Sequence, residues 1–155
     1  MNKDYLDILA AFLAETVEFL LVGAYALAVH GHPRATGDID LWVRCSPDNA
    51  RKILKALARF GAPVQDLTPA DFESPKIVYQ IGLAPNRIDI LTQIDGVVFD
   101  EAWMNRVEAE VESLRVPVIS RQDFIKNKRS TGRPKDLGDV SRLEEEEPTA
   151  LYPSA

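Results

Sequence analysis

The sequence predicts one domain of the α/β (α+β) class, in which a mixed β-sheet is flanked by helices. Helical and strand patterns alternate along the chain, which places helices between strands of one sheet. The length of 155 residues is that of one ordinary domain, which buries roughly 70% of its unfolded surface. Hydrophobic residues make up 46% and charged residues 27%, a balance that excludes a disordered, collagen-like or coiled-coil chain.

The first part of the chain alternates helix and strand patterns. Apolar residues spaced three and four apart predict an amphipathic helix over residues 3–16. The continuous apolar run 19–22, closed by Gly23, is typical of a strand buried on both faces. Alanine and leucine favour a short helix over residues 24–30. Residues 38–43 alternate acidic and apolar side chains, as a half-buried strand does.

The next helix has clear signals at both ends. Ser46 is an N-cap residue, Pro47 suits the first turn, and Gly61 follows the last apolar position, Phe60. A polar, proline-bearing connection follows. The remaining expected elements are strands over 76–82 and 87–93 forming a hairpin with a turn at 84–86, a helix over 99–105, weaker strands over 107–111 and 114–118, a helix opened by Ser120 and Asp123, and a helix from Pro134 to Leu143.

Residues 144–155 are expected to form an acidic, flexible tail, because four successive glutamates repel one another and nothing periodic follows. The folded domain should therefore span residues 1–143. No apolar run approaches the roughly 20 residues that cross a bilayer, and the start lacks a signal-peptide pattern. We expect a cytoplasmic protein without membrane association.

Charge is distributed unevenly along the chain. The net charge of −6 argues against a protein that coats nucleic acid by bulk electrostatics. Residues 121–135, however, contain six cations and one anion. This segment is either a solvated helix face and loop, or a site for a polyanion such as a triphosphate or an RNA backbone.

Three aspartates are the candidate catalytic and metal-binding residues. Residues two apart in a strand face the same way, so Asp38 and Asp40 project side by side, while Ile39 and Leu41 point into the core. Asp89, on another expected strand, joins the same face if the two strands are neighbours. Repelling carboxylates favour a bound divalent cation, and oxygen ligands suit Mg²⁺ or Mn²⁺. Alternatively, such aspartates only keep a strand edge soluble or cap a loop.

A triad holding two metal ions suits in-line displacement at phosphorus, and hence nucleotidyl transfer. The segments Leu21-Val22-Gly23-Ala24, Gly37-Asp38-Ile39-Asp40-Leu41 and Ile88-Asp89-Ile90 resemble the nucleotidyltransferase superfamily of the DNA polymerase beta type. The resemblance implies a nucleotidyltransferase-like fold and metal binding by the three aspartates. Lys126 and Asp136, with nine residues between them, resemble the motif of the abortive-infection type toxin branch.

Further residues are candidates for binding the nucleotide. The amides around Gly23 could receive a phosphate, although Ala24 replaces the family's second glycine or serine and would be strained at a positive φ angle. Arg34 is either a phosphate ligand or an ordinary surface arginine, and Thr36 could cap or bind. Lys126 and Lys135 suit contacts with a triphosphate or acceptor.

The expected function is transfer of a nucleoside monophosphate from a nucleoside triphosphate to a hydroxyl of RNA, such as a transfer RNA end, or of protein. Resemblance to the toxin branch implies a toxin with an antitoxin partner. The alternative is a degenerate nucleotidyltransferase-fold module that binds a nucleotide or a protein partner without turnover.

Overall fold

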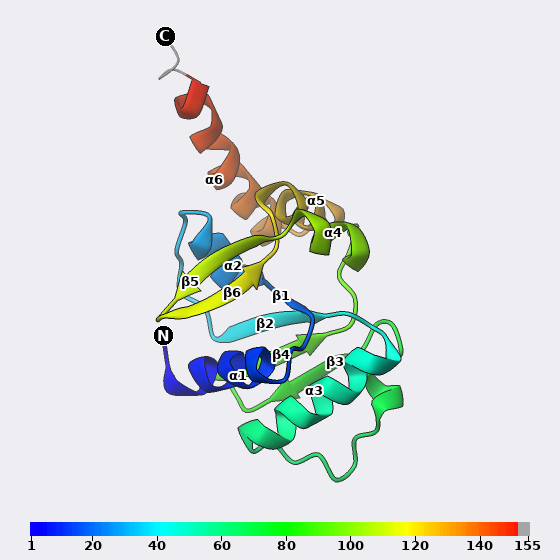
Figure 1. Ribbon diagram of the computed structural model, residues 1–155. Coiled ribbons are helices and arrows are strands. Elements are labelled where there is room, and N and C mark those ends of the chain that lie inside the picture. Colours follow the sequence, from blue (N-terminus) through cyan, green and yellow to red (C-terminus); the bar gives the residue numbers. More distant parts are fainter. Residues whose placement is uncertain (152–155) are drawn as a thin grey trace.

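The computed structural model describes the backbone of residues 1–151 and the side chains of residues 1–145. Helices are interspersed among the strands along the chain, as Figure 1 shows. In chain order the elements are α1 (Lys3–Ala14), β1 (Phe19–Val22), α2 (Gly23–Val29), β2 (Asp38–Val43), α3 (Pro47–Phe60), the 3₁₀ helix η1 (Pro69–Phe72), β3 (Val78–Ile81), β4 (Arg87–Leu91), α4 (Phe99–Asn105), β5 (Val107–Val111), β6 (Leu114–Val118), α5 (Arg121–Thr131) and α6 (Pro134–Leu151).

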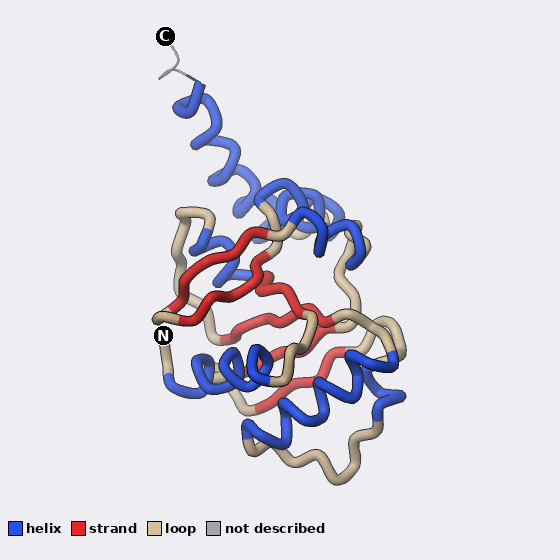
Figure 2. The backbone as a smooth tube through the Cα atoms, viewed as in Figure 1, coloured by secondary structure: helices blue, strands red, loops and turns tan. Residues whose placement is uncertain are grey.

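The strands form one mixed sheet in the order β3-β4-β2-β1-β6-β5. The pairs β2–β4 and β1–β6 are parallel, and the other neighbours are antiparallel. Figure 2 shows the strands running through the body of the molecule with helices around them. The predicted mixed sheet, single domain and hairpin of β3 and β4 are therefore confirmed.

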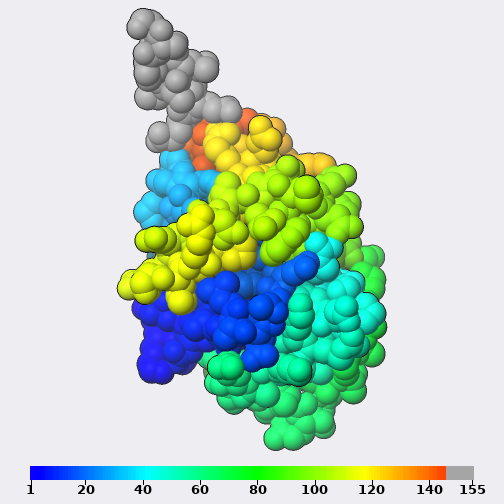
Figure 3. All heavy atoms as spheres, in the orientation of Figure 1, coloured from blue at the N-terminus to red at the C-terminus, as the bar shows by residue number. Residues whose placement is uncertain are grey.

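Helices α1 and α3 lie side by side and cover one face of the sheet, and α5 packs against α6. In the space-filling view the atoms of α1 and α3 form a continuous surface over the lower part of the molecule (Figure 3). The central strand β1 is buried at all four positions, as its apolar run predicts. The core is thus centred on β1 and β2, the strands that lead to the candidate site.

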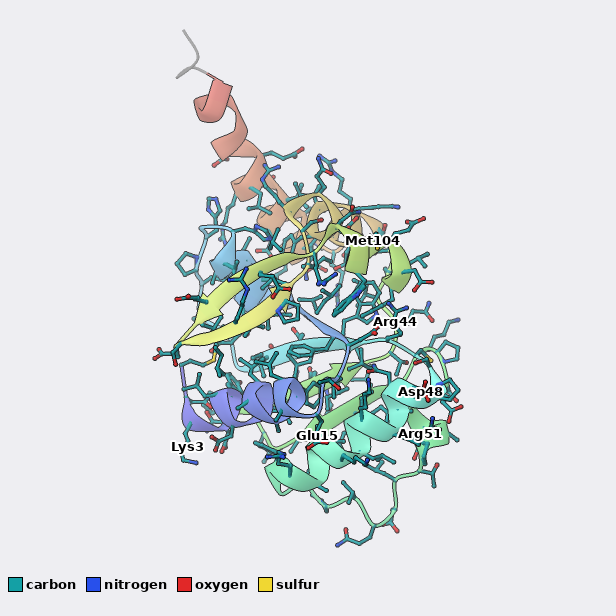
Figure 4. All side chains as sticks on the ribbon, viewed as in Figure 1. Lys3, Glu15, Arg44, Asp48, Arg51 and Met104 are labelled. Atoms are coloured by element: carbon teal, nitrogen blue, oxygen red, sulfur yellow. The ribbon has the colours of Figure 1, made fainter. Side chains whose placement is uncertain are left out.

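Capping residues set the ends of several helices. The Ser46 side chain accepts a hydrogen bond from the Asn49 N–H at the start of α3, and Gly61 ends that helix at φ 99°. At the start of α5 the Ser120 side chain accepts a hydrogen bond from the Asp123 N–H. On the outer side of α3, Asp48 and Arg51 form an exposed ion pair (Figure 4).

The polar, proline-bearing connection before β3 also contains the short helix η1, because Thr68 and Asp71 form a capping box and Phe72 is fully buried. One expectation about local structure was wrong. Helix α6 continues to Leu151 instead of ending at Leu143. Glutamate is a good helix former, and Glu144 pairs with Arg129 of α5, so repulsion does not end the helix there. Residues 152–155 of the expected tail lie outside the described part of the chain.

Within the described residues, none of the helices combines the length and the apolar character that a membrane crossing requires.

Candidate active site

The three aspartates come together at one end of two central strands. Strands β2 and β4 pair in parallel with Asp40 opposite Asp89, and Asp38 lies two residues before Asp40 on the same face. One carboxylate oxygen from each residue can be chosen such that all three atoms lie within 4.8 Å of one another. The expected convergence of these acids is confirmed. We call Asp38, Asp40 and Asp89 the acidic triad.

Gly23 makes room for the acidic triad. Its φ angle is +68°, and a Cβ atom at this position would lie 2.2 Å from Oδ2 of Asp40. A side chain there would therefore be strained and would collide with the carboxylate. Ala24, the next residue, lies in the first turn of α2 and does not share the positive φ angle, so the strain considered for it is absent.

Ionisation of Asp40 is electrostatically costly. Burial raises its pKa to about 7, with further contributions from the negative charges of Asp38 and Asp89 and a hydrogen bond with Asp89. The charge of Lys128 acts in the opposite direction. A cation bound beside Asp40 would lower this cost, because its positive charge stabilises the ionised carboxylate.

Arg87 is a member of the site that the sequence interpretation missed. Its Nη2 donates to Oδ2 of Asp38 at 2.6 Å and to Oδ2 of Asp89 at 3.1 Å, and its Nε donates to Oδ1 of Asp89 at 2.9 Å. Arg87 precedes Asp89 by two residues on β4, so strand alternation placed both side chains on one face. That signal was present in the sequence.

Thr36 and Arg34 reach the site from the loop between α2 and β2. The Thr36 hydroxyl donates to Oδ1 of Asp38 at 3.0 Å, so it orients one member of the triad. Arg34 donates two hydrogen bonds of 3.2 Å to the carboxylate of Asp139 on α6, which is only 2% exposed. Arg34 is thus fixed by a bidentate ion pair and is not an ordinary surface arginine.

On α5 and α6 the structure distinguishes cations that sequence reasoning could not. Lys126 is exposed and does not line the site, whereas Lys128, two residues later, does. Lys128 and Arg133 both contact the buried Asp136, at 3.3 Å and 2.7 Å. Burial tends to raise the pKa of Asp136, but its net pKa is lowered by a hydrogen bond from Thr131 and by these two cations. Lys135 lines the site as expected.

The acidic triad lines a cavity of about 460 Å³, together with Gly23 and Ala24. Four cations line the same cavity, namely Arg34, Lys128, Arg133 and Lys135, which we call the cationic wall. Asp136, the partner of Lys128 and Arg133, also lines it. Such a cavity can hold divalent cations on carboxylate oxygens and, on its cationic groups, an anion such as a polyphosphate.

Comparison with known proteins agrees with this arrangement. A family model described as "Nucleotidyltransferase of unknown function (DUF6036)" matches residues 7–145. A solved structure from Thermotoga maritima, described as that of a "putative nucleotidyltransferase", is similar with a TM-score of 0.60 and 18% identity. The alignment covers 94% of this chain and 96% of that one, which shows that the two share a fold. A search of curated proteins gives no match.

Proposed function

Because this chain belongs to that nucleotidyltransferase family, we propose that it transfers a nucleoside monophosphate from a nucleoside triphosphate to a hydroxyl of RNA or protein, with the help of divalent metal ions. One observation carries the proposal. Three carboxylates from two neighbouring strands converge within 4.8 Å at a cavity that is also lined by Arg34, Lys128, Arg133 and Lys135. Phosphoryl transfer depends on positioning and on charge stabilisation, and this cavity offers both signs of charge.

The donor set fits magnesium or manganese. All candidate ligands are hard carboxylate oxygens, and the described residues provide no sulfur or histidine ligand in this group. Asp38 and Asp40 would hold the ions, and Asp89 would hold the one on the acceptor side. Bound there, divalent ions would lower the pKa of the attacking hydroxyl and neutralise phosphate charge.

The remaining residues of the cavity bind and orient. Thr36 holds the Asp38 carboxylate in place through its hydroxyl. Lys128 and Arg133, both anchored on Asp136, would bind the triphosphate, together with Lys135. Because these cations are already held by a buried acid, they lose little freedom when a phosphate binds.

The toxin role, with an antitoxin partner, is a narrower proposal. It rests on the resemblance of Lys126 and Asp136 to the abortive-infection type branch. Asp136 lies in the cavity and Lys126 outside it, and the lysine that contacts Asp136 is Lys128. An antitoxin would have to suppress transfer and restore growth of cells that express this chain.

Transfer of a labelled nucleotide tests the proposal. The purified protein is incubated with each labelled NTP, Mg²⁺ or Mn²⁺, and total RNA or protein. We expect label on one class of acceptor, and a fall of at least about 100-fold in the Asp38→Asn variant. Asp48→Asn, the same change in the exposed pair on α3, is the matched control and should transfer normally.

The alternative, a module without turnover, gives a different result. It predicts no label on any acceptor. Label that persists in Asp38→Asn at the wild-type rate would contradict the assigned role of the acidic triad. A melting temperature unchanged by NTP and metal would exclude nucleotide binding as well.

A further inference from the structure

The Arg87 side chain occupies the space between two members of the acidic triad. Its Nη2 group is shared by Asp38 and Asp89, at 2.6 Å and 3.1 Å. In the same part of the site, one oxygen from each triad member lies close enough to bind a common ion. A magnesium ion binds its oxygen ligands at about 2.0–2.1 Å. Arg87 occupies both oxygens of Asp89 and Oδ2 of Asp38, so an ion that bridged the two carboxylates would compete with the guanidinium for at least the Asp89 oxygens.

Like charges reinforce this competition. Arg87 and a divalent cation would lie within a few ångströms of each other and would repel strongly. From these contacts we infer that Arg87 is an internal counter-ion of the acidic triad, and that a divalent ion binds only as the guanidinium leaves Asp38 and Asp89. The inference rests on the proposed metal site and adds a step that precedes nucleotide binding.

The surroundings of Arg87 allow its side chain to leave Asp38 and Asp89. Its backbone is fixed, because the carbonyl accepts a hydrogen bond from Tyr5 and the N–H donates to the Gly37 carbonyl. Its side chain is 33% exposed and lines the cavity, so it can turn into the cavity without moving the strand. There it would lie in the same cavity as Lys128, Arg133 and Lys135, the residues proposed to bind the triphosphate.

The charges of the site explain why a counter-ion is needed and why one is insufficient. Asp89 is 5% exposed, and an unpaired carboxylate at this depth is costly. Arg87 contacts Asp38 and Asp89 but makes no such contact with Asp40 among the described ion pairs. One positive charge thus partly neutralises three acids, which leaves the site attractive to a divalent cation.

Manganese titration followed by electron paramagnetic resonance tests the inference, because the signal of free Mn²⁺ falls as ions bind. We expect Arg87→Gln to bind Mn²⁺ about tenfold more tightly than the wild type, since a competing like charge is removed. The control is Arg133→Gln, which removes one cation from the cationic wall without touching the acidic triad. It should change the Mn²⁺ affinity much less.

The outcomes separate this inference from the proposed function. If the wild type binds Mn²⁺ and Arg87→Gln binds it equally or more weakly, the inference is wrong while the metal site stands. If neither protein binds Mn²⁺, both the inference and the proposed metal site are wrong. Equal gains in Arg87→Gln and Arg133→Gln would show a general effect of cavity charge, and would also overturn the inference.

A measurement on the wild type covers the case in which Arg87→Gln does not fold. The arginine Nε–H signals are observed by ¹⁵N NMR during a Mg²⁺ titration, with Arg87→Lys used for assignment. The Arg87 signal should shift as its hydrogen bond to Asp89 breaks, while that of Arg34, bound to Asp139, should stay in place. An Arg87 signal unchanged at saturating Mg²⁺ would overturn the inference.

Discussion

The acidic triad and the cationic wall line the same cavity, but their charges are neutralised in different ways. Three cations of the wall, Arg34, Lys128 and Arg133, are each paired with a buried carboxylate of α6. Among the described side chains, one cation contacts two of the three acids, and burial together with the charges of Asp38 and Asp89 raises the pKa of Asp40. The wall is therefore preorganised by its own partners, whereas the triad keeps an excess of negative charge that would attract a further cation.

The largest expected effect concerns the space that Gly23 leaves for the triad. Gly23→Ala should lower the free energy of unfolding by about 3 kcal/mol, because the new methyl group combines a left-handed φ with a collision against Asp40. Gly132→Ala is the matched control beside the wall, since Gly132 has the same φ of +68° and open space around it. It should cost about 1 kcal/mol.

Urea denaturation of both glycine variants with EDTA measures this difference. Gly23→Ala should also bind Mn²⁺ more weakly, because Asp40 has to turn away from the triad. Equal losses in the two variants would mean that the close approach of Asp40 to Gly23 does not contribute to the loss of unfolding free energy in Gly23→Ala.

A smaller loss is expected at the cationic wall. Asp139→Asn should destabilise the protein by about 2 kcal/mol, since it removes the charge that neutralises Arg34 in a mostly buried pair. Asp48→Asn breaks an exposed pair and should cost less than about 0.5 kcal/mol. Thermal and urea unfolding compare the two, and similar small costs would refute the view that the wall depends on buried partners.

Replacement of Asp40 by asparagine should instead stabilise the protein. Its folded-state pKa of about 7 lies above the ordinary value of 3.8, so the folded protein retains the proton to higher pH. This group therefore contributes stability at low pH, which is lost as the pH rises from about 4 to 7. Asp40→Asn should raise the free energy of unfolding at pH 8 by on the order of 1–3 kcal/mol, without divalent ions.

The pH provides the control for Asp40→Asn. At pH 5 Asp40 is already protonated in the folded protein, so the variant should gain little. Urea denaturation at both pH values, with EDTA present, gives the comparison. A loss of stability at pH 8 would contradict the crowding of negative charge in the triad.

Much of the acidic side could be predicted from the sequence, because it depends on short-range rules. Strand alternation places Asp38 and Asp40 on one face, and the apolar neighbours Ile39 and Leu41 are fully buried on the other. Only the pairing of β2 with β4, which brings Asp89 opposite Asp40, had to be assumed. Arg87 obeys the same alternation and could have been found.

The cationic side could not be predicted at the same level. Two residues apart on a helix, Lys126 and Lys128 point about 200° apart, and a count of charges does not say which one faces the cavity. Arg34 and Asp139 pair across 105 positions of sequence, and no local pattern relates them. The helix α6 had to be placed in three dimensions before either contact was visible.

The parallel pairing of β2 and β4 has a consequence for how the protein reaches its active form. Asp38 and Arg87 are 49 positions apart, so the chain must close a long loop before these strands can meet. Before this loop closes, Asp89 is separated from Asp38 and Asp40 by the flexible chain, so the three acids cannot bind one ion together. Divalent ions bound at the proposed site would therefore stabilise the completed fold and would not assist the earliest, local steps of folding.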